Sequence, residues 1–150
     1  MTPIVFCDVD GVLVTRKTIL AKNPNEVFDK ACVKNLNTLC DRTGASIVVS
    51  SSWRRGRSVQ QLQVLFAREG VKAPVIDKTP EDGQERGKQI LQWIDEQKEE
   101  VVSYVVLDDD SWDIHPYITN YVHLANGMET GLRMEHVHKA VEILNVEVMK

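Results

Sequence analysis

Groups of aspartates follow two apolar segments of this chain, and carboxylates at such spacing can hold a metal ion. Asp8 and Asp10 follow the run PIVFC, and Asp108, Asp109 and Asp110 follow SYVVL. In extended backbone, residues two positions apart point to the same side, so Asp8 and Asp10 lie together. Two negative charges ~4 Å apart repel by roughly 4 kcal/mol at an effective dielectric of about 20. The group is therefore costly unless some carboxylates are protonated or a cation joins them, and the hard oxygen ligands suit Mg²⁺.

Other polar residues near these positions suit an anionic substrate. Ser50 ends the run SIVV with a hydroxyl that can donate a hydrogen bond, and Lys88 lies in the first turns of an expected helix, where anions are attracted. A carboxylate, a metal ion, a hydroxyl and an ammonium are the parts that phosphoryl transfer needs. The carboxylate can itself attack phosphorus and form an aspartyl-phosphate. Four neighbouring residues are expected to contact the substrate: Gly11, Ser51, Arg54 and Arg55.

Strand-like and helix-like segments alternate along the chain and must position these residues. Short apolar strands are expected before Asp8, before Ser50 and before Asp108, with one more at YVHLA. In the expected helix over 84–97, the residues predicted to face inward are Ile90, Leu91 and Ile94, with Trp93 also packing. Further helices are expected over 26–41, between Ser58 and Gly70, and over about 133–145, whereas 11–25 reads as an irregular arm and 71–82 as a loop.

This alternation predicts an α/β fold with an open parallel sheet covered by helices on both faces. In such sheets ligands bind beyond the carboxyl ends of the strands. If the strands are parallel, the polar groups at 8–10, 50–52 and 108–110 share one edge. A chain of 150 residues is expected to form a single domain over 1–150.

The composition excludes several classes of protein. A net charge of −4 argues against a broadly basic protein that coats nucleic acid, though not against a local basic patch. The apolar runs are too short to cross a bilayer, so no membrane partner is expected. Three cysteines without CxxC spacing read as buried thiols in a reducing compartment. With no secretory pattern at the start, we expect a cytoplasmic protein.

The sequence resembles the haloacid dehalogenase (HAD) superfamily. DVDGVL at 8–13 resembles its first motif, Ser50 the second, Lys88 the third, and VVLDDDSWD the fourth. The wording of these segments, together with the tail TGLRMEHVHKAVEIL, is similar to the HAD domain of Swiss-Army-knife RNA repair proteins. The resemblance implies a three-layer, HAD-type Rossmann-like fold. Because neither insertion point holds enough residues for a folded domain, no cap domain is expected.

The resemblance also implies roles for the candidate residues. Asp8 would be the nucleophile and a Mg²⁺ ligand. Asp10 would be the general acid and then the base, and would bind the metal through its backbone carbonyl. Ser50 would hydrogen-bond the phosphoryl oxygens, and Lys88 would neutralise their charge. The remaining metal ligands would be Asp108 and Asp109, with Asp110 surplus to the pattern and Asp113 a further acid, so the register of the pair stays open.

An open site suits a large phosphorylated substrate, and the first expectation is a phosphate at an RNA or DNA end. Basic residues near the motifs can bind the flanking phosphates. Trp53 and Trp112 stand beside motifs, where each either stacks on bases or packs at the sheet edge, with packing favoured for Trp53. The alternative substrates are small metabolites, nucleotides or phosphoproteins, and a role within a larger repair assembly stays open.

Two alternatives to an enzyme belong to another class of protein. A receiver domain carries its acidic pair first and its acceptor aspartate midway, whereas here the middle strand ends in the serines 50–52. A HAD-fold binding module without activity would lack some of the catalytic residues, but the expected ones are all present. The prediction is therefore a HAD-type phosphatase.

Overall fold

The computed structural model describes residues 2–81, 83–110, 114 and 116–149, with side chains up to residue 145. Its centre is a five-stranded sheet in which every pairing is parallel and the strand order is β3-β2-β1-β4-β5. The strands are β1 (Ile4–Cys7), β2 (Ser46–Val49), β3 (Val75–Lys78), β4 (Tyr104–Asp108) and β5 (Tyr121–His123). The predicted parallel sheet is therefore confirmed, and β1 lies at its middle.

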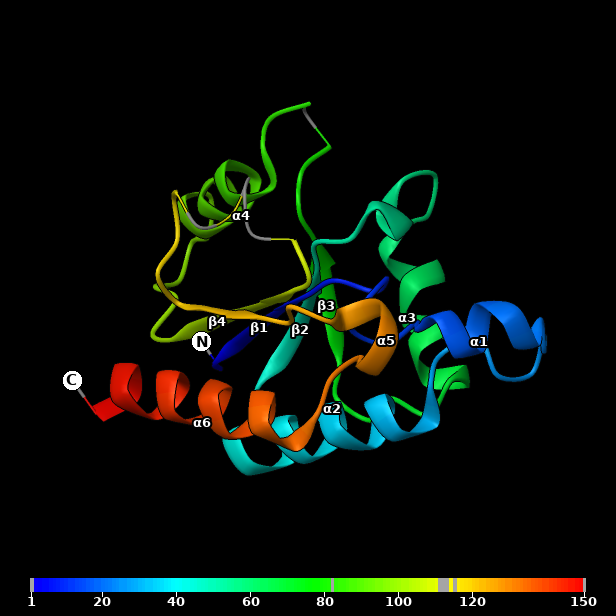
Figure 1. Cartoon of the computed structure of the whole chain (residues 1–150). Coiled ribbons are helices and arrows are strands. Elements are labelled where there is room, and N and C mark those ends of the chain that lie inside the picture. Colours follow the sequence, from blue (N-terminus) through cyan, green and yellow to red (C-terminus); the bar gives the residue numbers. More distant parts are fainter. Residues whose placement is uncertain (1, 82, 111–113, 115, 150) are drawn as a thin grey trace.

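Helices cover both faces of this sheet (Figure 1). On one face lie α2 (Lys30–Thr43), α3 (Val59–Arg68) and α6 (Met134–Met149), and on the other lies α4 (Arg86–Asp95). The short helices are α1 (Arg16–Ala21), the 3-10 turn η1 (Ser52–Arg54) and α5 (Gly127–Thr130). This is the expected three-layer, Rossmann-like arrangement, and the residues that the structure describes form no separate cap domain.

The two core clusters follow from the alternation of side chains along each strand. Val5 and Cys7 of β1 pack towards α2 and α6, while Ile4 and Phe6 pack towards α4. All four are fully buried, because a central parallel strand has helices on both sides. Trp93 of α4 meets Phe6 edge to face, at 5.5 Å between ring centroids, as its predicted packing role requires.

Several predicted helix signals are confirmed. Ser58 caps α3 by accepting a hydrogen bond from the Gln61 N–H. Gly44 ends α2 with a left-handed φ of 71° and donates its N–H to the Cys40 carbonyl. The three cysteines are buried and free, in agreement with their reading as small apolar residues. None of the described helices combines the length and apolar character needed to cross a bilayer.

Three local expectations are wrong. Residues 75–78 form the edge strand β3 inside the segment read as a loop, and residues 16–21 form α1 inside the segment read as an irregular arm. On α4 the buried stripe consists of Gly87, Gln89, Ile90 and Trp93, and the predicted inward Leu91 is 37% exposed. This change in the inward face of α4 alters the candidate site.

Candidate active site

The parallel register brings the polar strand ends together. Cys7 of β1 lies beside Val49 of β2 and Leu107 of β4. The residues that follow these three, Asp8, Ser50 and Asp108, therefore lie at the same edge of the sheet. The Ser50 N–H donates to the Cys7 carbonyl, and the Asp8 N–H donates to the Leu107 carbonyl, each at 3.1 Å. Neighbouring central strands therefore deliver a hydroxyl and carboxylates to the same place, as the sequence predicted.

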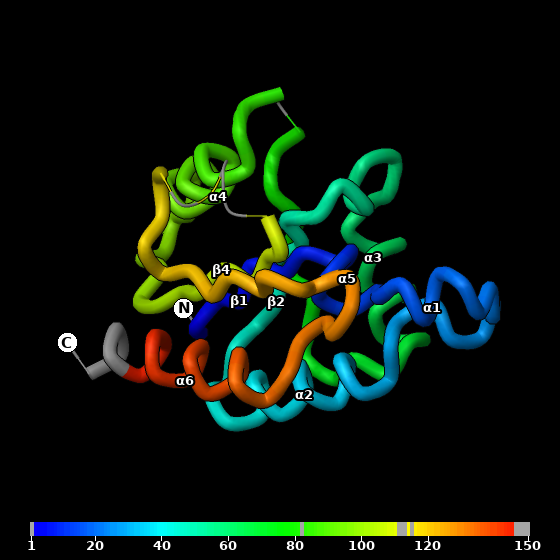
Figure 2. The backbone as a smooth tube through the Cα atoms, viewed as in Figure 1, coloured from blue at the N-terminus to red at the C-terminus, as the bar shows by residue number. Residues whose placement is uncertain are grey.

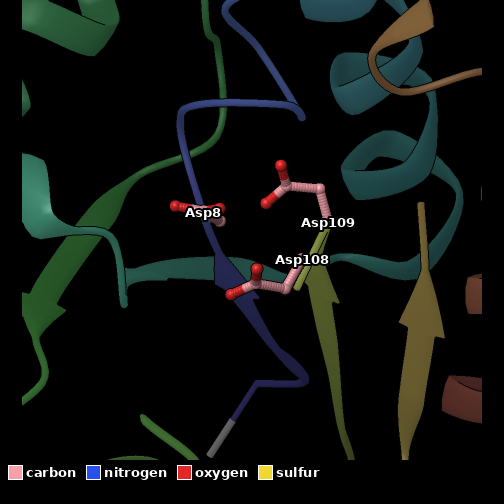
Figure 3. Close-up of side chains that lie close together, drawn as sticks. All are labelled: Asp8, Asp108 and Asp109. Carbon is pink, nitrogen blue, oxygen red and sulfur yellow. The ribbon is translucent and has the colours of Figure 1, made fainter. Parts of the chain in front are cut away.

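The structure gathers Asp8, Asp108 and Asp109 into one acidic cluster (Figure 3). One carboxylate oxygen from each residue lies within 4.8 Å of the others. Asp8 and Asp108 are almost fully buried, at 4% and 0% exposure, and Asp109 is partly exposed. Asp110 is not a member of this cluster. The pair that faces Asp8 is thus Asp108 with Asp109.

Local hydrogen bonds fix the two buried carboxylates. The Val9 N–H donates to Asp8 Oδ1 at 2.8 Å, and the Asp110 N–H donates to Asp108 Oδ1 at 2.9 Å. Each carboxylate is therefore held by the turn that follows its own strand. The Asp110 N–H therefore supports the cluster by holding the Asp108 carboxylate.

Arg86, the first residue of α4, reaches into the acidic cluster. Its Nη1 lies 2.6 Å from Asp108 Oδ2 and 3.5 Å from Asp8 Oδ2. Charge-assisted contacts of this length are among the stronger interactions of a site. The sequence reading missed Arg86. The signal was present, because Arg86, Gln89, Ile90 and Trp93 follow the i, i+3, i+4, i+7 spacing of one helix face.

Lys88 lies elsewhere than predicted. Its side chain is exposed, and its Nζ lies over the ring of Tyr117, 5.3 Å from the ring centroid. Two positions along a helix turn a side chain to nearly the opposite face, so Lys88 and Arg86 point apart. In this structure the cation beside the carboxylates is Arg86, not Lys88.

Burial makes the charge of the cluster costly. It is the main cause that raises the pKa of Asp8 well above its ordinary value, and the charge of Asp108 raises it further. Burial also raises the pKa of Asp108, although Arg86 lowers it. The three carboxylates have one described guanidinium against them, which leaves two negative charges uncompensated. A divalent cation offsets that excess and keeps such carboxylates ionised.

The donor set fits Mg²⁺. Every candidate ligand atom is a carboxylate oxygen, the donor that a hard divalent cation prefers. The Asp109 carboxylate has no hydrogen bond to another described side chain or backbone group, so it is available as a ligand. The residues that would hold the ion are therefore Asp8, Asp108 and Asp109.

Asp10 lies on the tight turn after β1. It is two residues from Asp8 in the sequence, but its carboxylate is not among the three that form the acidic cluster. The turn is closed by the Gly11 N–H, which donates to the Val14 carbonyl at 2.8 Å, and Asp10 pairs with Val14 as an isolated bridge. The Asp10 side chain is partly exposed. That position beside a buried Asp8 suits a group that exchanges protons with a substrate or with water.

The predicted glycine has a packing role. Gly11 has a φ of 80°, and a Cβ added there would overlap the Asp109 carboxylate. Gly127, at the start of α5, is equally constrained, because its Cβ would overlap the Gly11 carbonyl. Figure 2 shows α5 beside the loop that follows β1. Two glycines thus allow the β1 turn, the Asp109 side chain and α5 to approach closely.

The two predicted serines differ. The Ser50 hydroxyl is fully buried and has no hydrogen-bond partner among the described residues. Such an unpaired group at a strand end is expected to meet a ligand, since burial without a partner is costly. The Ser51 oxygen instead accepts from the Trp53 N–H at 3.1 Å and caps η1. Ser50 is therefore the better placed of the two for a phosphoryl group.

The two predicted arginines also differ. Arg54 is only 2% exposed, and its guanidinium donates to backbone carbonyls and to Gln89. This burial speaks against the predicted direct contact with substrate. The Arg55 side chain is exposed and has no hydrogen bond or ion pair to another described residue, while its backbone N–H donates to the Ser52 carbonyl. Trp53 packs on Phe28 at 6.1 Å between centroids, which agrees with its expected packing role, and Arg57 covers its ring.

Strand β5 braces the turn that carries the acidic pair, a feature the sequence reading missed. The Tyr121 hydroxyl donates to the backbone carbonyls of Asp108 and Asp110. His123 Nε2 lies 3.0 Å from the Asp109 carbonyl, which can only accept, so the ring nitrogen donates. These contacts fix the backbone on which the cluster is built. The predicted alternatives Asp113 and Trp112 lie outside the described residues.

Comparison with known proteins places the chain in a family. A search of curated proteins found no match. A family described as the HAD domain in Swiss Army Knife RNA repair proteins matches residues 4–137, a range that includes the whole acidic cluster, Ser50 and Arg86. That range covers most of the 150 residues. The chain therefore belongs to the family of HAD domains in Swiss Army Knife RNA repair proteins.

Proposed function

We propose that this protein is a Mg²⁺-dependent phosphomonoester hydrolase that works through an aspartyl-phosphate on Asp8. Membership of the HAD family implies a phosphatase-type hydrolase. The observation that carries the proposal is the buried cluster of Asp8, Asp108 and Asp109 with Arg86 in contact. The unpaired Ser50 hydroxyl at the same edge supports the proposal, since it can donate to a phosphoryl oxygen.

In the first step an oxygen of the Asp8 carboxylate attacks the phosphorus of the substrate. The bond from phosphorus to the leaving oxygen breaks as the bond to Asp8 forms. Asp10, in its protonated form, gives its proton to the leaving oxygen, so the product is a neutral alcohol. Splitting hydrolysis in this way replaces one difficult displacement by two easier ones.

In the second step water attacks the phosphorus of the aspartyl-phosphate. Asp10, now a carboxylate, takes a proton from that water and returns to its starting form. The bond between phosphorus and Asp8 breaks, which restores the carboxylate and releases inorganic phosphate. The sum is one phosphoester and one water converted to one alcohol and one phosphate.

Fixed donors stabilise the charge on the transferring group. The buried Ser50 hydroxyl donates to a phosphoryl oxygen, and the Arg86 guanidinium supplies positive charge at the same edge. Arg86 thus takes the part that the sequence reading assigned to Lys88. When bound by Asp8, Asp108 and Asp109, Mg²⁺ supplies further charge neutralisation and orients the phosphate.

The substrate we propose is a phosphate at the end of an RNA or DNA strand. The name of the family places its members in RNA repair proteins. No separate domain covers the site within residues 8–86, of which all but 82 are described. Arg55 is an exposed basic residue at the end of η1, five positions after Ser50, and we propose that it binds a flanking phosphate.

The test is hydrolysis of an aryl phosphate by the intact chain and by Asp8→Asn, with Mg²⁺ or with EDTA. Asp8→Asn keeps the shape of the side chain but removes the nucleophile, so turnover is expected to fall by at least about 10³-fold with folding retained. Thermal unfolding in the same buffer is the control. Full activity in EDTA, or in Asp8→Asn, would refute the proposal.

A further inference from the structure

Arg54 is a buried guanidinium at the centre of the loops around the site. Its Nε and two Nη atoms donate at 2.8–3.2 Å to acceptors in three segments. These acceptors are the carbonyls of Ser50, Ser51, Thr79 and Pro80 and the Oε1 of Gln89. A planar fork with fixed donor directions can bridge such separate acceptors, whereas a lysine ammonium offers a single point.

Two of the three segments joined by Arg54 carry groups proposed for phosphoryl transfer, Ser50 and Arg86, and the remaining one leads into α4. The first is the end of β2, where Ser50 places its unpaired hydroxyl. The second is the loop from β3 to α4, held through Thr79 and Pro80. The third is α4 itself, held through Gln89 at 2.8 Å. Arg54 therefore links the serine strand end to the helix that begins with Arg86.

Gln89 lies on the same face of α4 as Arg86, one turn further along. It is buried, with 5% exposure, so its hydrogen bond to Arg54 is shielded from water. A shift at Gln89 moves the first turn of α4 as a rigid unit, because helix hydrogen bonds connect the two positions. The Nη1 of Arg86 has little tolerance for such a shift at 2.6 Å from Asp108.

We propose that Arg54 and Gln89 are positioning residues that set α4, and thereby Arg86, against the acidic cluster. This inference rests on the proposed function, since it concerns the placement of a group in that site. The hydrogen bonds of Arg54 described above run to loop carbonyls and to Gln89. The contribution of Arg54 and Gln89 to turnover passes through Arg86, so it should depend on whether Arg86 is present.

The test is a double-mutant cycle with two variants of Gln89. Gln89→Leu has a similar volume but no acceptor, and Gln89→Glu keeps the acceptor oxygen as the matched control. With Arg86 present, we expect Gln89→Leu to lower kcat for an aryl phosphate about 10-fold, since small misplacements of catalytic groups are costly. Gln89→Glu should stay within about 2-fold of the parent chain.

The decisive comparison is the same pair in Arg86→Ala. There Gln89→Leu should change kcat by less than about 2-fold, because the group it positions is gone. Binding of inorganic phosphate in Mg²⁺, measured by calorimetry, is a second readout that needs no turnover. It should weaken with Gln89→Leu when Arg86 is present and stay unchanged in Arg86→Ala.

Equal losses from Gln89→Leu in both backgrounds would overturn the inference, as would a Gln89→Glu variant as impaired as Gln89→Leu. Thermal unfolding checks that each variant folds, and Gln89→Met, which also lacks an acceptor, replaces Gln89→Leu if that variant unfolds. Failure of the proposed function would be recognised by a different result: the parent chain would show no Mg²⁺-dependent hydrolysis. If the parent chain is active but the effects of Gln89→Leu and Arg86→Ala are additive, the positioning role is refuted and the proposed function is not.

Discussion

Arg86 and Lys88 stand two positions apart on α4, and the structure gives them opposite surroundings. Arg86 contacts two buried carboxylates, whereas Lys88 is exposed beside Tyr117. Of the two cations, only the one at the reacting group can stabilise the charge that develops there, because water screens an exposed charge. The two residues therefore make a matched pair for an experiment.

Arg86→Ala is expected to lower kcat/KM for an aryl phosphate by about 10²–10³-fold, the usual cost of removing one charge-stabilising donor. Lys88→Ala should change it by less than about 2-fold, since surface substitutions away from a site are nearly neutral. Steady-state kinetics in saturating Mg²⁺ measure both. A larger loss in Lys88→Ala than in Arg86→Ala would return the role to Lys88.

At the residue scale, strand ends were easier to predict than helix faces. Asp8, Ser50 and Asp108 each follow a short apolar run, and parallel pairing brings such ends together whatever the details of packing. On α4 the apolar residues Ile90, Leu91 and Ile94 allow more than one inward face. The polar Gln89 belongs to the buried stripe because Arg54 binds it, a contact that spacing alone does not reveal.

At the scale of elements, α6 begins with a titratable cap. The Arg133 N–H donates to His136 Nδ1 at 2.9 Å, so a neutral ring satisfies a backbone donor at the helix start. Burial lowers the pKa of His136; Lys139 and Arg133 act in the same direction, and Glu135 acts against them. A protonated ring has no free acceptor and cannot make this contact.

The stability of the fold should therefore depend on pH through His136. The unfolded chain has an ordinary histidine pKa of about 6.5 and binds the proton more readily than the folded chain. The free energy of unfolding falls as the pH drops below that value, until the folded pKa is passed. His136→Gln can accept from the same N–H without titrating. Between pH 7.5 and 5.5 the parent chain should lose more unfolding free energy than this variant.

Urea unfolding at several pH values measures that difference, and groups shared by the two chains cancel in the comparison. Parallel curves for the parent and His136→Gln would contradict the role given to the histidine. The comparison of the parent chain with His136→Gln reports on the stability of the fold alone. Helix α6 packs on the same face of the sheet as α2, and none of its described residues belongs to the site.

The long helices and four of the five strands were predicted well, whereas α1 and the edge strand β3 were not. Helix α2 is followed by its stop signal, Gly44, and α3 is preceded by its start signal, Ser58. β3 has only two apolar residues, Val75 and Ile76, between Pro74 and Pro80, which read as loop signals. Its pairing with β2 decides its conformation. Such edge strands form because the sheet supplies a partner, which the local sequence does not show.

At the scale of the whole molecule, an open site predicts a preference for a long substrate. An oligonucleotide with a terminal phosphate should have a higher kcat/KM than the matching mononucleotide, because only the longer substrate has flanking phosphates for exposed basic residues. Removing one phosphate contact with Arg55→Ala should reduce the slope of log kcat/KM against log salt by about 1. Competition assays over a range of salt concentrations measure this slope.

Arg42→Ala is the matched control for Arg55→Ala. Arg42 is an exposed arginine in the last turn of α2, which leads into the start of β2 at the opposite edge of the sheet. It should leave the salt slope unchanged. A mononucleotide or sugar phosphate turned over better than the oligonucleotide would remove the argument from the open site.

The central claim is that phosphate passes through Asp8. The most direct measurement is rapid acid quenching of Asp10→Asn during hydrolysis of a radiolabelled aryl phosphate, followed by peptide mapping. An aryl oxide leaves without protonation, but the second step lacks its base, so the intermediate should accumulate. We expect label on the peptide that contains Asp8, approaching about one phosphate per chain, and none in Asp8→Asn. Phosphate release with unlabelled protein, or label on another residue, would contradict the account.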